Sequence, residues 1–223
     1  MLQSIKKWLQ EIFAAKPKLP IQPELPMQPL PVVPAPIDTG LSKNPAYNQA
    51  KKHEGEGENK SKFVAYLAAF WPKTGLNYKT IIGSSVAWCG LFIVAMNSET
   101  GLNYIKKGAG ARNWALYGQK IEWKTQGIPR GAVMHLNHDG NCSSKSSNHV
   151  TFSDGDCTAE ELLKAKATVP GFGGNQQNTV NRTMYDVKKI CAVRWPEEIT
   201  LPSKVTKSVN CSSGSKAGNV VTR

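Results

Sequence analysis

The sequence predicts an α+β fold in which N-terminal helices pack on a small antiparallel sheet. Up to about residue 118, apolar residues recur with the spacing of helices, and one apolar stretch is long enough for a buried helix. From about residue 131, apolar segments shorten to strand length and are separated by glycine, asparagine and aspartate. The chain has 223 residues and is 40% hydrophobic, which is enough for one sizeable domain plus appendages. Helices followed by a run of short strands is the α+β order.

Residues 1–15 predict a short amphipathic helix. Its apolar positions are spaced by three and four residues: Leu2, Ile5, Trp8, Leu9, Ile12 and Phe13. Lys6, Lys7, Gln10 and Glu11 lie on the opposite side. Because charged residues interrupt the continuous apolar block that a secretory signal peptide needs, the segment does not match one. We expect the helix to dock on a partner or on the rest of the chain, or to make weak contact with a membrane surface.

Residues 16–40 form a proline-rich linker. Proline recurs at every third position from Pro17 to Pro29, which matches the turn of a polyproline II helix and predicts a semi-rigid spacer. A globular domain is expected over 41–197. The polar, basic segment 198–223 is expected to be a mobile tail unless Cys211 tethers it.

Within the globular domain, the pattern predicts four helices and four strands. The helices are expected at 44–54, 61–70, 90–96 and 111–118. The strands are expected at 131–136, 149–153, 165–172 and 188–195, with a turn at 173–177.

The composition narrows the function classes. The net charge is +12, yet the sequence contains neither a basic block nor a nucleic-acid-binding motif, so we do not expect nucleic acid as the partner. An anionic polymer such as a bacterial wall or outer leaflet fits the charge equally well, and so does simple solubility. No apolar run has the length of a membrane span, which excludes an integral membrane segment.

The five cysteines leave two interpretations open. In the first, one cysteine is a reactive thiol and the other four form disulfides, which indicates an oxidising compartment. In the second, all five are reduced thiols in a cytosolic protein. Four cysteines allow three pairings, among which the sequence does not choose.

Cys89 is the strongest candidate nucleophile because it precedes the apolar stretch 90–96 and so begins a buried helix. Backbone N–H groups and the helix dipole at that end favour a thiolate and can hold an oxyanion. The alternative is a buried cysteine that only packs.

A nucleophilic cysteine needs a base, and His149 opens a predicted strand downstream. A cysteine on a helix followed by a histidine on a sheet is the papain-like order. Asn175, in the turn after the next strand, is expected to orient the imidazole, with Gln176 and Asp154 as fallbacks.

A metal site is the rival interpretation of the histidines. His135, His138, Cys142 and His149 are plausible zinc ligands, but their spacing matches no standard finger and the interval resembles a solvated loop. We therefore predict no metal and no cofactor.

Five blocks in order resemble the NlpC/P60–CHAP superfamily of cysteine peptidoglycan hydrolases, in a branch common in phages, prophages and bacterial effectors. The blocks are Trp88-Cys89-Gly90-Leu91-Phe92, Ala111-Arg112-Asn113-Trp114, Pro129-Arg130-Gly131-Ala132-Val133, His149-Val150 and Gly173-Gly174-Asn175-Gln176. The resemblance extends over about 150 residues, from Ala46 to Trp195, and five ordered blocks are far more specific than any one alone. Three departures alter the expected cleft rim: Asn148 replaces a glycine, Ala132 replaces an acidic residue, and the loop carrying Cys142 is longer.

The resemblance implies a papain-like fold and cleavage of an amide bond in the peptide stem of peptidoglycan. Cys89, His149 and Asn175 would be catalytic. The residues that would bind substrate are Trp88, Arg112, Trp114 and Gln176, although both tryptophans are also candidates for the core. The alternative is a non-catalytic module that grips peptidoglycan through its basic surface.

The resemblance also bears on location and partners. Without a signal peptide, a monomer acting in the periplasm or cell wall would arrive as a secreted interbacterial effector or as a phage lysis enzyme passing through holin pores. An effector would have a secretion carrier and an immunity protein as partners. Amidase and endopeptidase activities use the same machinery, so the bond that is cut stays open.

Overall fold

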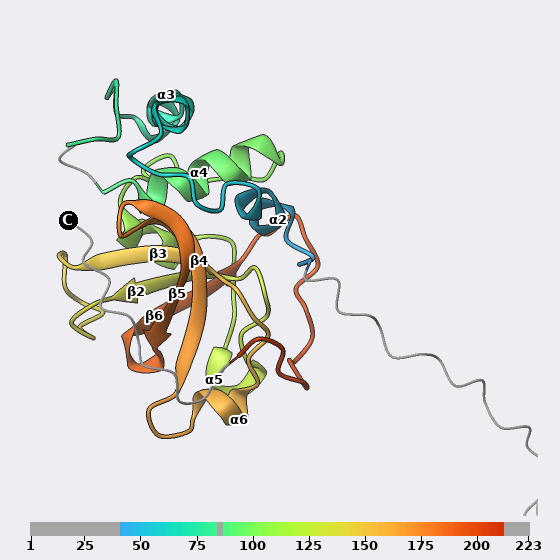
Figure 1. The fold of residues 1–223 in the computed structure, drawn as a ribbon. Helices are drawn as coiled ribbons and strands as arrows, with labels where there is room; N and C mark the ends of the chain where they lie inside the picture. Colours follow the sequence, from blue (N-terminus) through green and yellow to red (C-terminus); the bar gives the residue numbers. More distant parts are fainter. Residues whose placement is uncertain (1–40, 84–86, 212–223) are drawn as a thin grey trace, which may run out of the picture. The chain divides into compact units, whose positions relative to one another are not determined.

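The computed structural model describes residues 41–83 and 87–211 of the chain, all within one compact unit, Thr39–Arg223. The amphipathic helix expected at 1–15 and the linker expected at 16–40 lie outside the described residues. The predicted α+β class is confirmed, because helices pack against a six-stranded antiparallel sheet (Figure 1).

The strands follow the order β1-β6-β2-β3-β4-β5 across the sheet. Their bounds are β1 Gln119–Lys120, β2 Val133–Asn137, β3 Asn148–Ser153, β4 Thr168–Gln176, β5 Thr179–Asp186 and β6 Ile190–Trp195. Four of them match the predicted strands, whereas β1 and β5 were not predicted. The turn predicted at 173–177 was wrong in part, because β4 continues through a register shift to Gln176.

Three helices from the first half of the domain lie together in Figure 1: α2 (Pro45–Lys51), α3 (Ser61–Ala68) and α4 (Cys89–Glu99). Asn44 caps α2 by accepting a hydrogen bond from the backbone of Ala46 at 3.0 Å. Residues 89–97 of α4 are all buried, because the helix packs against β3 and β4 as well as the other helices. The segment predicted as a helix at 111–118 forms the 3-10 helix η2 (Ala111–Leu116).

The short elements complete the fold. They are the 3-10 helices η1 (Trp71–Thr74) and η3 (Val187–Lys189) and the helices α5 (Trp123–Gln126) and α6 (Ala159–Leu162). Figure 1 shows α5 and α6 beside each other at the end of the sheet away from α4.

Two apolar clusters divide the strand side chains between them. Val150 and Phe152 of β3 belong to the cluster that contains α4. Successive side chains of a strand alternate in direction, so His149 and Thr151 point to the other face. There the second cluster contains Leu136 and Tyr185. This alternation puts the imidazole of His149 and the helix that carries Cys89 on different faces of one strand.

Two disulfides pair four of the cysteines, Cys142–Cys191 and Cys157–Cys211, and leave Cys89 free. The first bond ties the β2–β3 loop to β6. The second tethers the segment that follows β6 as far as residue 211, and Leu201 of that segment packs against the second apolar cluster. Within the described residues, no helix has the length and apolar character of a membrane span.

Candidate functional site

Cys89 is the first residue of α4, and its side chain is 1% exposed. β3 pairs with β4 only through Phe152 and Ser153, so the N–H of Val150 has no partner strand on that side. The backbone N–H groups of Val150, Gly90 and Cys89 itself lie close enough to the Cys89 sulfur to favour its thiolate form. The sulfur thus lies where the start of α4 meets the residue that follows His149.

The expectation that the helix N-terminus lowers the pKa of Cys89 was wrong in direction. The three backbone N–H groups do favour the thiolate, but burial outweighs them and raises the pKa of Cys89 above its ordinary value. The physical reason is that the start of α4 is enclosed by sheet and loops, so a charged sulfur would lose its hydration.

The imidazole of His149 is completely buried. It stacks on the Tyr185 ring with centroids 5.7 Å apart and planes inclined by 29°, and its Nε2 lies 3.4 Å from Gln176 Oε1. Burial lowers the pKa of His149 to about 3, with a smaller contribution from His138. His149 is therefore neutral near pH 7.

The contacts of the Gln176 carboxamide identify the tautomer of His149. Its Oε1 accepts hydrogen bonds from the Tyr185 hydroxyl at 2.7 Å and the Thr151 hydroxyl at 3.1 Å, while its Nε2 donates to the carbonyl of Asn181. An acceptor oxygen at 3.4 Å from Nε2 favours the tautomer of His149 that has its proton on Nε2. The lone pair is then on Nδ1, which is buried and has no hydrogen-bond partner in the described part of the chain.

Cys89 and His149 are neighbours that do not touch through their reactive atoms. No hydrogen bond joins the sulfur to the ring among residues 41–83 and 87–211. The sulfur is nevertheless close to the histidine's surroundings, since the charge of a Cys89 thiolate contributes to raising the pKa of Tyr185. The bare Nδ1 and the thiol are thus buried on opposite faces of β3 near the start of this strand.

Gln176, not Asn175, is the residue beside His149. Asn175 lies in the irregular part of β4 with φ at 59°, and no described hydrogen bond links its side chain to His149. The other fallback, Asp154, instead receives hydrogen bonds from Tyr47 and Arg182. The sequence order alone could not separate adjacent residues whose side chains leave a strand in opposite directions.

The expected substrate-binding residues separate into two groups. Trp88 and Trp114 are fully buried, and their indole N–H groups donate to Glu58 at 2.9 Å and to the carbonyl of Gly108 at 2.8 Å. Both rings therefore have the core role that the sequence left open. Arg112 is exposed and lines a pocket of about 410 Å³ together with His135 and the Cys142–Cys191 disulfide.

Cys142, one of the four residues considered as zinc ligands, forms a disulfide with Cys191 and so offers no thiolate to a metal ion. No group of three or more histidine, cysteine, aspartate or glutamate side chains within the described ranges is arranged to hold a metal ion. His135 instead hydrogen bonds to Asn148 at 2.8 Å, and Asn148 also donates to two carbonyls of the β2–β3 loop. The asparagine that departs from the expected glycine thus holds this longer loop in place.

Sequence reasoning missed Thr151 and Tyr185, the two hydroxyl donors that orient Gln176. Thr151 was detectable in principle, because it is two residues after His149 and so shares its face of the strand. Tyr185 lies on β5, which was not predicted. Comparison of the chain with protein-family models, with curated proteins and with solved structures finds no match.

Proposed function

We propose that this chain is a thiol hydrolase that cleaves an amide bond in the peptide stem of peptidoglycan. The observation that carries the proposal is the place of Cys89, the only free cysteine of the described residues, at the start of α4 beside the backbone of Val150. Val150 follows His149, whose buried Nδ1 has no hydrogen-bond partner among the described residues. The five sequence blocks that resemble NlpC/P60–CHAP enzymes and the helix-on-sheet architecture support a papain-like version of this chemistry.

The proposed mechanism starts from a neutral pair, and it requires a conformation in which the His149 side chain has turned to bring Nδ1 to the Cys89 sulfur. His149 Nδ1 takes the proton of the Cys89 thiol as the sulfur attacks the amide carbonyl carbon, which forms an S–C bond and a tetrahedral oxyanion. The N–H groups of Cys89 and Gly90 stabilise that oxyanion. Collapse breaks the C–N bond, and His149 returns the proton to the leaving amine. Water then hydrolyses the thioester and regenerates the thiol.

Gln176 has the positioning role in this mechanism. Its carboxamide oxygen accepts from Nε2 and so keeps the lone pair of His149 on Nδ1, while Tyr185 and Thr151 hold the carboxamide itself. Arg112, the exposed member of the expected binding residues, would contact the substrate at the edge of its pocket.

The disulfides and the charge support a site of action outside the cytosol. Disulfides persist in oxidising compartments, and a net charge of +12 favours an anionic wall. We propose that the protein acts in the periplasm or cell wall as an interbacterial effector or a phage lysis enzyme. The effector case adds a secretion carrier and an immunity protein as partners.

A specific observation favours a second candidate, a non-catalytic peptidoglycan-binding module. Cys89 and His149 are both buried, both neutral and not hydrogen bonded to each other. A degenerate site would have these properties, because it would no longer need an exposed nucleophile.

Digestion of purified sacculi separates the two candidates. We expect the parent to release muropeptides with new amine and carboxyl ends, identified by mass spectrometry, and Cys89→Ala to release none while keeping its circular dichroism and its binding to sacculi. Equal product release by parent and Cys89→Ala would refute the thiol mechanism. Binding without products from either protein would establish the second candidate.

A matched pair of variants tests the positioning residue. Gln176→Ala removes the oxygen that faces His149 and is expected to lower kcat about 10- to 100-fold, a loss comparable to that from removing a residue that orients a catalytic base. Asn175→Gly removes the neighbouring side chain while suiting the φ of 59° at this position, so its kcat should stay near that of the parent. The reverse result would give the positioning role to Asn175.

A further inference from the structure

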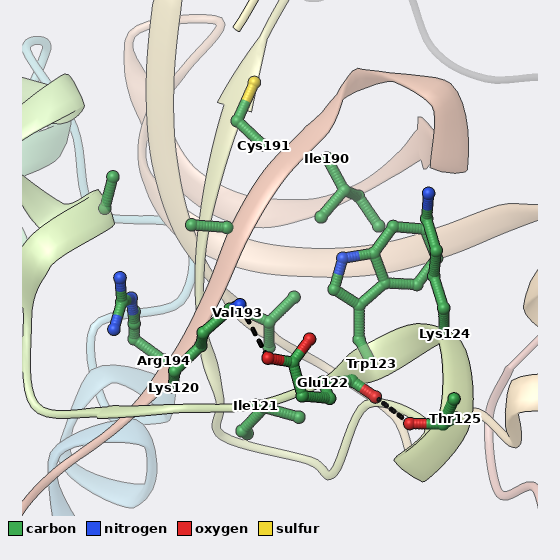
Figure 2. A pocket seen from close by; sticks show the side chains of 12 residues that line it. Lys120, Ile121, Glu122, Trp123, Lys124, Thr125, Ile190, Cys191, Val193 and Arg194 are labelled. Atoms are coloured by element: carbon green, nitrogen blue, oxygen red, sulfur yellow. Dashed lines mark hydrogen bonds and ion pairs between the residues drawn. The ribbon is translucent and has the colours of Figure 1, made fainter.

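Two grooves flank the Trp123 side chain at the end of the sheet away from α4. The first, of about 510 Å³, lies between α5 and β6, and the second, of about 600 Å³, lies between α5, α6 and the start of η3. Trp123 and Lys124 line both. Figure 2 shows the first groove with the indole of Trp123 beside Ile190 and with Lys120 and Arg194 together on the opposite side.

The charge of the grooves is strongly positive. Six basic side chains line them: Lys120, Lys124, Lys164, Lys166, Lys188 and Arg194. Two acidic side chains accompany these, and both are engaged. Glu122 pairs with Lys120 at 2.6 Å, and Asp186 caps η3 by accepting from the backbone of Lys188 at 2.8 Å.

Arg194 is the observation that points to a ligand. Its side chain is half-buried, its Nε is buried without a hydrogen-bond partner, and no ion pair is formed with it by the part of the chain that the structure describes. A guanidinium in that setting binds a carboxylate or phosphate well, because its planar donors match two oxygens at once.

Apolar side chains on the same surface indicate a ligand that has apolar faces as well as negative charge. Trp123 is half-exposed, whereas the other four tryptophans of the described residues are fully buried. Its indole N–H donates to no described residue. Leu163, which lines the second groove, is 63% exposed. Aromatic rings with a free N–H suit ligands that have an apolar face and a polar edge.

We propose that these two grooves, here called the Trp123 surface, bind an anionic glycan, a polymer of sugar rings that bear carboxylates or phosphates. Sugar rings supply apolar faces for Trp123 and Leu163, and their acidic groups meet Arg194 and the lysines. The two disulfides place the protein where anionic glycans, rather than nucleic acids, are the abundant polymers. The hollowed shape, with a single exposed leucine, argues against a flat membrane surface.

This surface is separate from Cys89, so the inference does not depend on the proposed hydrolase activity. Figure 1 shows α5 and α6, which carry much of the surface, well apart from α4. In a hydrolase, such a surface would hold the protein on the wall between cleavage events.

Binding of the full chain to sacculi tests the proposal. The full-length protein with Cys89→Ala is titrated against purified sacculi, once with and once without their covalently attached phosphate polymers, to separate carboxylate from phosphate sources. Lys164→Gln/Lys166→Gln/Lys188→Gln is expected to weaken binding about tenfold, and Arg194→Gln a further few-fold. The matched control is Lys62→Gln/Lys79→Gln/Lys106→Gln, which removes the same charge from exposed positions outside both grooves and should change the Kd less than twofold.

Quenching of tryptophan fluorescence by acrylamide provides a second readout. Bound glycan should protect the fluorescence of the parent, and Trp123→Phe should lose that protection. Equal weakening by the two triple variants, or unchanged protection in Trp123→Phe, would overturn the proposal. So would tighter binding to a thymidine oligonucleotide or to anionic lipid vesicles than to sacculi. Since every arm measures binding, failure of hydrolysis leaves each result interpretable.

Discussion

At the scale of single residues, burial decides the charge state of the candidate site. It raises the pKa of Cys89 and lowers the pKa of His149 to about 3, so the folded protein has a thiol and a neutral imidazole near pH 7. Three nearby backbone N–H groups reduce the rise in the pKa of Cys89 without reversing it. The proposed hydrolysis therefore requires the proton to move during the reaction, because Cys89 and His149 form no preformed ion pair.

The pH dependence of Cys89 alkylation tests this charge state. Iodoacetamide labels only this cysteine in unreduced protein, because the other four are in disulfides. Since a raised pKa leaves less thiolate at every pH, the rate at pH 7 should fall below that of an unperturbed thiol. It should still be rising beyond about pH 9, the ordinary value for a cysteine.

Reduced glutathione is the reference thiol, and protein unfolded in urea with its disulfides intact is the control for access. In unfolded protein, the alkylation rate of Cys89 should equal that of reduced glutathione. A plateau between about pH 5 and pH 8 would reveal a thiolate–imidazolium pair and contradict the neutral site.

At the scale of elements, the site depends on how closely β4 approaches α4. A Cβ atom at Gly174 would lie 2.4 Å from the Trp88 ring and 2.8 Å from Phe92 Cβ, so only glycine allows this approach. Trp88 and Cys89 are adjacent, and Gln176 is two residues from Gly174 on the same strand. The contact at Gly174 therefore sets the spacing between the helix that begins at Cys89 and Gln176, which contacts His149.

Gly174→Ala should lower the free energy of unfolding by about 1–3 kcal/mol, since overpacking forces strand and helix apart. Urea denaturation measures this loss. Gly110→Ala is the matched control: the nearest atom to its Cβ would be the end of the Asn113 side chain, at 3.1 Å, so the substitution should cost little. If the two variants unfold at the same urea concentration, the close approach of β4 to α4 is not a constraint.

At the scale of the whole molecule, two disulfides join parts that are distant in sequence. Cys142–Cys191 spans 49 residues and connects the β2–β3 loop to β6, and Cys157–Cys211 spans 54 and retains the segment after β6. Each bond restricts the unfolded chain and so raises its free energy relative to the folded state.

Loss of either disulfide should lower the free energy of unfolding by about 4 kcal/mol, on a chain-entropy estimate for loops of this length. The measurements are urea denaturation of Cys142→Ser/Cys191→Ser and of Cys157→Ser/Cys211→Ser, and of the parent with and without reductant. Cys89→Ser serves as the control, because it removes a thiol that closes no loop. If the urea concentration at which the parent is half unfolded is the same with and without reductant, the disulfides are not formed in solution.

Much of the fold was predictable because long, regular patterns are local signals. The apolar stretch of α4 and the strands β2, β3 and β6 were predicted from such patterns. β5 was missed because most of its side chains are only partly buried, with Val180 and Tyr185 as its buried members, so its apolar signal is weak. β1 has only two residues, which is too short for any periodicity.

By itself, the sequence determined the helices α2, α3 and α4 and four of the six strands, that Cys89 begins a buried helix, and that His149 lies at the start of a strand. Only the tertiary structure decided that Gln176 faces His149, which cysteines pair, and that both reactive groups are neutral. The physical reason is that facing and pairing depend on strand register and on chain ends meeting in space, where a shift of one residue reverses a side chain. Charge state depends likewise on everything packed around a group, which no local pattern contains.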